Sequence, residues 1–252
     1  MLCAWLSAWL CAWLCACTPM NPAERLSYGP FHAVRIYRAQ PPVEHLVLLL
    51  SGDGGWGSPL DAIASRLSAQ GTLVAGIDVR DLFASFERDP RQCISPGEAL
   101  ADLTRHLQQR YALSLRPPVL IGYSAGATFA YVALAGAPPG TFAGALTLSF
   151  CTDLDLSKPL CPTPGLRSEP RSTGVHLLPA PALPAPWMAL HGLDDTECPA
   201  AEAREFAGAL SGVHFIGLPG VTHRYHRVSH WWPAFEAAWS QLLAPASAAG
   251  AP

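Results

Sequence analysis

Charged side chains are scarce in this 252-residue chain: Asp, Glu, Lys and Arg make up 14% of it, against roughly a quarter of an average soluble domain. Lys and Arg number 16 and Asp and Glu 19, so the formal net charge is −3. The lack of a basic excess excludes a strongly basic nucleic-acid-binding protein. Half of the residues are hydrophobic, which supplies the apolar surface of a large core and argues against disorder through most of the chain.

The first 17 residues carry no charge at all and repeat Ala-Trp-Leu every four residues. The apolar run is shorter than the roughly 20 residues that span a bilayer comfortably, and Thr18-Pro19 ends it. We predict a secretory signal or lipoprotein leader over 1–17, one α/β domain over 25–243 and a disordered tail over 244–252. The missing Lys or Arg at the start departs from the usual signal pattern, so a misassigned start or a membrane anchor stays open.

Leu14-Cys15-Ala16-Cys17 also resembles a bacterial lipoprotein box, in which the last Cys is acylated and becomes the mature N-terminus. The alternative is simple cleavage after Ala16. We therefore expect a periplasmic protein, with a lipid anchor through Cys17 as one possibility.

The remaining cysteines contain no CxxC spacing, which argues against a structural zinc site. Four thiols in an oxidising compartment predict two disulfides and allow three pairings, among which the sequence cannot choose. They are Cys93, Cys151, Cys161 and Cys198.

Apolar, β-branched runs alternate with helical patterns along the rest of the chain. The predicted strands are Phe31–Arg38, His45–Leu50, Thr72–Val79, Val119–Tyr123, Ala143–Phe150, Trp187–His191 and Val213–Leu218. The predicted helices are Ser58–Gln70, Ser95–Tyr111, Ala125–Ala135, Pro199–Leu210 and Ser229–Leu243. This alternation predicts an α/β fold, with a mostly parallel sheet and helices on both faces. Residues 156–186 are rich in Pro and show no periodicity, so we expect a long loop that is either a lid or inert.

A first glycine motif follows the strand at His45–Leu50. Gly52, Gly54 and Gly57 satisfy G-x-G-x-x-G, and Asp78 ends the next strand. This spacing is typical of a dinucleotide-binding loop with its ribose-binding acid.

A second motif, Gly122-Tyr-Ser124-Ala-Gly126, lies between a buried strand and a helix. G-x-S-x-G in this context is typical of the nucleophile elbow of an α/β-hydrolase, where flanking glycines leave room for a sharp turn. We predict Ser124 as the nucleophile.

Hydrolases of this fold need an acid and then a histidine later in the chain. Gly192 to Pro199 has the G-x-x-D-x-x-x-P spacing of their acid loops, which selects Asp195. Its neighbour Asp194 and the earlier Asp153 stay as alternatives.

His223 follows the last predicted strand and is our candidate base, with His226 as the substitute. His223, His226 and His230 also have helix-like spacing, but no nearby carboxylate completes a metal site of the usual kind. We expect neither a metal nor a cofactor.

The order Ser124, Asp195, His223 changes how the first glycine motif is interpreted. In these hydrolases the loop after the third strand supplies one oxyanion-hole N–H and the residue after the nucleophile the other. This predicts the N–H groups of Asp53 and Ala125 as the oxyanion hole. The hydrolase interpretation explains several motifs and the dinucleotide interpretation only one, and NAD is not expected outside the cytoplasm.

Three blocks together resemble the bacterial VirJ/AcvB family: Leu50-Ser-Gly-Asp-Gly-Gly-Trp56, the elbow, and Leu218-Pro-Gly-Val-Thr-His223. The resemblance implies an α/β-hydrolase fold, an exported or periplasmic protein, and a link to virulence and type IV secretion. It also implies hydrolysis of lysyl-phosphatidylglycerol at a membrane surface. The family's usual His-His pair is Thr222-His223 here, so only the second histidine is present.

We therefore expect an exported serine hydrolase that cleaves the aminoacyl ester of a phospholipid. A lysyl group calls for an anionic site, for which Asp53 and Asp153 are candidates, and Trp56 and Tyr123 are further candidate substrate-binding residues. Two alternatives stay open: a non-catalytic partner of secretion-system proteins, and a carboxylesterase or lipase of other specificity.

Overall fold

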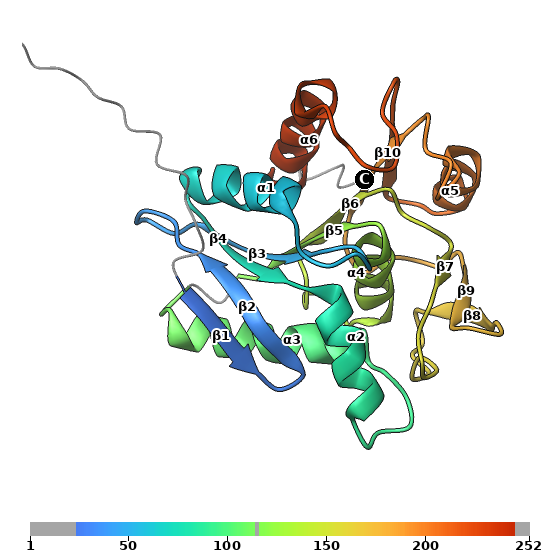
Figure 1. The fold of residues 1–252 in the computed structure, drawn as a ribbon, viewed down its shortest axis with the longest axis horizontal. Coiled ribbons are helices and arrows are strands. Elements are labelled where there is room, and N and C mark those ends of the chain that lie inside the picture. Colours follow the sequence, from blue (N-terminus) through green and yellow to red (C-terminus); the bar gives the residue numbers. More distant parts are fainter. Residues whose placement is uncertain (1–23, 114–115, 245–252) are drawn as a thin grey trace, which may run out of the picture.

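A computed structural model describes residues 24–113 and 116–244. The predicted leader with Cys17 and residues 245–252 of the predicted tail lie outside the described residues. The main sheet has eight strands in the order β1-β2-β4-β3-β5-β6-β10-β11 (Figure 1). They are β1 (Glu24–Tyr28), β2 (Phe31–Tyr37), β3 (His45–Leu50), β4 (Thr72–Ile77), β5 (Val119–Tyr123), β6 (Gly144–Leu148), β10 (Trp187–Gly192) and β11 (Val213–Leu218).

The strands β1 and β2 run antiparallel at one edge, and the pairs from β4 through β11 are parallel. Strand β3, HLVLLL, is buried from Leu46 to Leu50 because neighbouring strands and helices enclose it. A near-continuous apolar run of this kind is typical of a parallel strand covered on both faces. The carboxyl ends of β3, β5, β6, β10 and β11 therefore lie at one edge of the sheet.

Two helices cover one face of the sheet and four cover the other (Figure 1). The first pair is α1 (Ser58–Ala69) and α6 (Val228–Leu243). The second group is α2 (Val79–Arg88), α3 (Pro96–Arg110), α4 (Ala125–Gly136) and α5 (Ala200–Gly208). Helix α4 is buried from Gly126 to Ala135, which explains its almost wholly apolar sequence.

The predicted α/β fold is confirmed, and the predicted strands and helices of the main sheet are all present. Besides the strands of a second, small sheet, two elements were missed. Strand β1 has no apolar alternation, and its Leu26 alone is buried. Helix α2 begins at Val79 because the Asp78 side chain caps it by accepting the Asp81 N–H, so β4 ends at Ile77 rather than at Val79.

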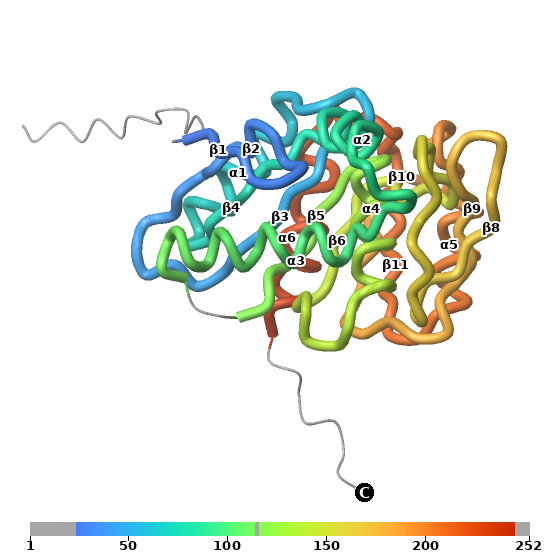
Figure 2. Tube along the Cα trace, turned by 90° about the horizontal axis from the view of Figure 1, so that it is seen from below, coloured from blue at the N-terminus to red at the C-terminus, as the bar shows by residue number. Residues whose placement is uncertain are grey.

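The expectation of an unpatterned loop over 156–186 was wrong in part. Strands β8 (Arg167–Pro170) and β9 (Val175–Leu178) pair with each other and with the short β7 (Asp153–Leu154) in the order β7-β9-β8. This small sheet lies at the same end of the molecule as α5 (Figure 2). The four-residue strands are too short to give a clear period-2 pattern, and β8 is exposed throughout.

Two disulfides are formed, as predicted, and the structure selects their pairing. Cys93 joins Cys161 and Cys151 joins Cys198. Such bridges are typical of proteins that fold outside the reducing cytoplasm. Within 24–113 and 116–244, no helix is long and apolar enough to cross a bilayer.

Candidate active site

Ser124 lies at a sharp turn between β5 and α4, with φ +53° and ψ −124°. The glycines on either side make this turn possible. A Cβ at Gly122 would lie 2.2 Å from the Gly126 carbonyl oxygen, and one at Gly126 would lie 2.1 Å from the Ser51 carbonyl oxygen. The backbone is therefore packed too closely for side chains, and it holds the Ser124 hydroxyl at the carboxyl end of β5.

His223 and Asp195 come to Ser124 from the loops after β11 and β10. His223 Nε2 lies 2.9 Å from Ser124 Oγ, and His223 Nδ1 lies 2.9 Å from Asp195 Oδ2 and 3.1 Å from Oδ1. All three residues are buried. The structure thus brings together the serine, histidine and aspartate that the sequence predicted, in hydrogen-bond contact and in the order of a catalytic triad.

Asp195 accepts hydrogen bonds on both oxygens besides those from His223. The N–H groups of Glu197 and Cys198 donate to Oδ1 at 3.0 and 2.9 Å, and the Ser149 hydroxyl donates to Oδ2 at 2.6 Å. Burial raises the pKa of Asp195, but the hydrogen bonds from His223, Ser149 and Cys198 outweigh it and lower that pKa to about 2. Asp195 is therefore a carboxylate near neutral pH.

This carboxylate sets the state of His223. Burial lowers the pKa of His223, but the hydrogen bond and charge of Asp195, together with the charges of Glu197 and Asp53, raise it above its ordinary value. In neutral His223 the proton belongs on Nδ1, facing Asp195, because a carboxylate can only accept. Nε2 is then free to accept the Ser124 proton.

The loop after β3 approaches Ser124 closely. A Cβ at Gly52 would lie 3.3 Å from the Ser124 Cβ, so this position favours glycine. In the described part of the chain, the N–H groups of Asp53 and Ala125 donate no hydrogen bond, and Ala125 is the first residue of α4, whose first N–H groups lack intrahelical acceptors. Both residues line one cavity with Ser124, as an oxyanion hole requires.

Asp78, the candidate ribose-binding acid of the first glycine motif, is bound to its own loop. Its carboxylate accepts the Trp56 N–H at 3.0 Å and caps α2. The three histidines do not share one helix: α6 begins at Val228 and contains only His230, and His226 is exposed in the preceding loop.

The two alternative acids, Asp194 and Asp153, are placed away from His223. Asp194 is exposed, in contrast to its neighbour Asp195. Asp153 lies 3.0 Å from Arg171 and 2.7 Å from His176 Nδ1. The Asp153 carboxylate is therefore already paired with side chains at the small sheet.

The two aromatic candidates occupy different places. The Trp56 indole N–H donates to Asp61, and its ring fills the space that a side chain at Gly76 would need, so Trp56 packs over β4. Among the described residues that line the cavity beside Ser124, Trp56 is absent. The Tyr123 ring lies 5.5 Å from that of His223, next to the reacting groups.

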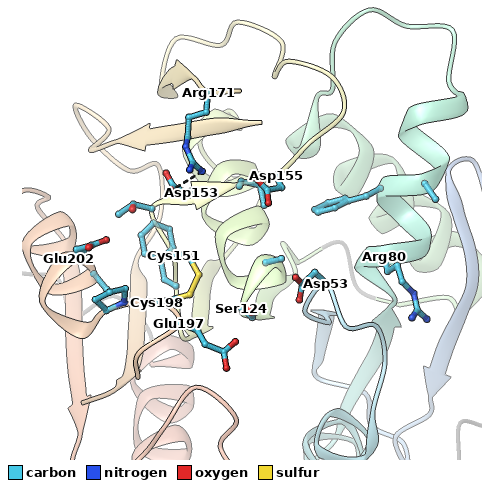
Figure 3. A pocket seen from close by; sticks show the side chains of 18 of the residues that line it. Asp53, Arg80, Ser124, Cys151, Asp153, Asp155, Arg171, Glu197, Cys198 and Glu202 are labelled. Carbon is cyan, nitrogen blue, oxygen red and sulfur yellow. Dashed lines mark ion pairs between the residues drawn. A yellow bond between two sulfur atoms is a disulfide. The ribbon is translucent and has the colours of Figure 1, made fainter. Parts of the chain in front are cut away.

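A cavity of about 540 Å³ opens beside Ser124, between α2, the small sheet and α5 (Figure 3). Six of its lining side chains are acidic and two are arginines. Asp53 lies next to Ser124, and Arg171 pairs with Asp153 on the far side (Figure 3). The acidic members are Asp53, Glu87, Asp153, Asp155, Glu197 and Glu202.

Sequence reasoning missed the role of four residues in this site. Ser149 and the Cys151–Cys198 bridge hold the acid loop, and Glu197 Oε2 lies 3.7 Å from His223 Nε2. The position of Ser149 directly after β6, at the same sheet edge as Ser124, was the available signal.

Comparisons with known proteins agree with this architecture. Residues 44–141 match the family model described as bacterial virulence protein (VirJ). No curated protein matches the chain by sequence. Among solved structures, the apo form of Thermogutta terrifontis esterase 2 is 17% identical with a TM-score of 0.64, covering 89% of this chain and 95% of that one.

Two further structures are similar. TT1662 from Thermus thermophilus is 19% identical with a TM-score of 0.57, covering 88% of this chain and 98% of that one. Esterase PE8 is 14% identical with a TM-score of 0.56, covering 83% and 98%. The resemblance noted in the sequence is thus confirmed: the chain has the α/β-hydrolase fold and matches the VirJ family over residues 44–141.

Proposed function

We propose that this protein is a serine ester hydrolase that removes a cationic aminoacyl group, such as lysyl, from a phospholipid outside the cytoplasm. The observation that carries the hydrolase assignment is the contact of 2.9 Å between His223 Nε2 and Ser124 Oγ, with Asp195 behind the histidine. Supporting it are the elbow, the two unengaged N–H groups and the esterase fold of the similar structures.

The chemistry follows from this geometry. Ser124 Oγ attacks the ester carbonyl while His223 Nε2 takes its proton, and Asp195 stabilises the resulting imidazolium. The N–H groups of Asp53 and Ala125 receive the negative charge that develops on the carbonyl oxygen, each donor lowering the barrier by about 3 kcal/mol. His223 then protonates the leaving alcohol, and water releases the amino acid by the same steps in reverse order.

The acidic cavity supports a cationic acyl group. An aminoacyl ester of lysine carries two ammonium groups, and the cavity beside Ser124 has an excess of carboxylates. In the described chain Asp53 forms no ion pair, whereas Asp153 is engaged by Arg171 and His176. Asp53 and Glu197, which both lie near the reacting groups, are therefore the favoured ammonium partners, and Asp153 is not.

The test compares purified wild type with Ser124→Ala on vesicles that contain lysyl-phosphatidylglycerol, with release of free lysine as the measurement. Wild type is expected to release lysine and Ser124→Ala to lose at least about 10³-fold in rate. Equal release from both proteins, or none from either, would refute this activity. Alanyl-phosphatidylglycerol is the matched substrate: Asp53→Asn is expected to reduce the preference for lysyl over alanyl.

A non-catalytic role beside secretion-system proteins stays the second candidate, and a carboxylesterase of other specificity the third. Covalent labelling of Ser124 by a fluorophosphonate without lysine release would favour the carboxylesterase. A membrane anchor through acylated Cys17 would place the cavity at its lipid substrate, and incorporation of a labelled fatty acid tests it.

A further inference from the structure

The segment between β11 and α6 presents its side chains alternately inward and outward. Val221, His223 and Tyr225 are buried, while Arg224 between them is exposed. The Tyr225 hydroxyl donates to the Leu190 carbonyl at 3.0 Å, which ties this segment to β10. The same backbone that places His223 at Ser124 therefore fixes the position of Arg224 beside it.

Arg224 borders a second cavity, of about 100 Å³, that shares no lining residue with the acidic one. Helices α1 and α6 contribute to it, whereas α2 and α5 contribute to the acidic cavity, and these helix pairs cover opposite faces of the sheet. The acidic cavity is lined by Ser124 and the small cavity by its neighbour Tyr123, so the two cavities lie on either side of the turn that carries the serine. Apart from Arg224 the small cavity is lined by Gly55, Gly57, Pro59, Leu60, Ile63, Tyr123, Leu148, Tyr225 and Trp231.

The guanidinium of Arg224 has no acidic partner within the described ranges. By contrast, Arg171 in the acidic cavity is paired with Asp153. Arg227, three residues further on, is also unpaired among the described residues and lines an adjoining cavity of about 350 Å³ with His226 and His230. An unpaired arginine fork at the mouth of an apolar cavity is suited to a phosphate oxyanion.

Tyr123 lines the small cavity and directly precedes Ser124, which lines the acidic cavity. Burial raises its pKa to about 12, the charges of Glu197, Asp195 and Asp53 act in the same direction, and that of Arg224 opposes them. The residue before Ser124 therefore lies within reach of carboxylates and of Arg224 together.

We propose that Arg224 binds a phosphodiester group on the alcohol side of the scissile ester, while the apolar cavity receives the carbon atoms next to it. The substrate lies across Ser124 with its cationic acyl group on the acidic side and its phosphate at Arg224. This inference rests on the proposed ester hydrolysis and names the second half of the substrate.

The test uses two soluble esters: a lysyl ester of glycerol, and the same ester with a methyl phosphodiester on the glycerol. Wild type is expected to prefer the phosphodiester about tenfold in kcat/KM, chiefly through KM, because a hydrogen-bonded charge pair contributes on that scale. Arg224→Gln is expected to reduce the preference to near one, and Arg224→Lys to retain part of it. The matched control is Arg25→Gln, exposed on the edge strand β1 far along the sheet, which is expected to keep the wild-type preference.

An equal kcat/KM for the two esters in wild type, or a preference that survives in Arg224→Gln, would overturn the proposal. If neither ester is hydrolysed, the proposed aminoacyl specificity fails, and the anion site is tested separately by the rate of fluorophosphonate labelling of Ser124. Methyl glycerophosphate is expected to slow labelling of wild type but not of Arg224→Gln. Protection by phosphatidylglycerol vesicles without protection by the soluble phosphodiester would point to general surface attraction, against a site for a single phosphate.

Discussion

The Ser149 hydroxyl donates a hydrogen bond of 2.6 Å to Asp195 Oδ2, joining the end of β6 to the loop after β10. Both side chains are fully buried or nearly so. Ser149 has φ +53°, and its N–H donates to the Leu190 carbonyl at 3.1 Å, so its own position is fixed by the sheet. Ser149 thereby holds Oδ2 of Asp195, while the Cys198 N–H holds Oδ1 and His223 Nδ1 contacts both oxygens.

The first prediction concerns this bond. Ser149→Ala removes a donor from a buried carboxylate, which is expected to cost about 1.4 kcal/mol of transition-state stabilisation and therefore to lower kcat/KM by about tenfold. The acidic limb is set by His223, far above the pKa of Asp195, so the loss is expected at every pH and the limb is expected to stay in place. The measurement is kcat/KM against pH. Ser68→Ala in α1 removes another buried serine, whose hydroxyl bonds the Ser65 carbonyl, and is expected to keep the wild-type profile.

A second prediction concerns the pH dependence of the base. The proposed mechanism needs neutral His223, and Asp195, Glu197 and Asp53 raise its pKa, so the acidic limb of kcat/KM is expected above pH 6.5. Glu197→Gln removes one of these charges and is expected to move the limb to lower pH. A neutral ester is the substrate, so that ammonium binding does not contribute. Glu205→Gln, exposed on α5, is the control, and a limb that both variants leave in place would contradict the role of Glu197.

Several site residues could be predicted because their spacing is dictated by the chain path. Ser124, Asp195 and His223 each follow a strand of a parallel sheet, and the carboxyl ends of such strands meet at one edge. The strand runs were readable because burial on both faces demands continuous apolar sequence, as in β3.

The remaining features depend on contacts between distant segments. Ser149 is one of many serines, and only the packing of β6 beside β10 gives it Asp195 as a partner. The pairing of Cys151 with Cys198 depends on the same neighbourhood. Trp56 shows the converse: its conspicuous motif suggested a ligand contact, whereas Gly76 on β4 leaves the space that the indole ring occupies.

A third prediction links the acid to stability. The pKa of Asp195 is about 2 in the folded protein and about 3.9 for an unfolded chain. A lowered pKa contributes stability above the unfolded value, and that contribution is lost as pH falls from about 4 through 2. We expect about 2 kcal/mol of unfolding free energy to be lost there in wild type and to be absent from the pH dependence of Asp195→Asn. His223 is protonated in both states over this range and does not contribute. Urea unfolding at pH 2 to 5 measures the difference, and parallel curves for the two proteins would contradict it.

The last prediction separates the two disulfides. The Cys151–Cys198 bridge closes a loop of 47 residues and the Cys93–Cys161 bridge one of 68 residues. Each bridge is expected to stabilise the fold by about 4 kcal/mol, so removing either pair should lower the melting temperature by a similar amount. Their effects on catalysis should differ. Cys198 donates its N–H to Asp195, and its sulfur is bonded to Cys151, two residues after Ser149.

Replacing both Cys151 and Cys198 by Ser frees the acid loop from β6, and we expect kcat/KM to fall by about tenfold or more at a temperature where the variant is fully folded. Replacing both Cys93 and Cys161, which join the segment before α3 to the segment before β8, is the matched control with kcat/KM retained. Equal activity losses in the two double variants would assign both bridges to stability alone. A loss confined to the first variant ties the position of Asp195 to the oxidised state of the Cys151–Cys198 bridge.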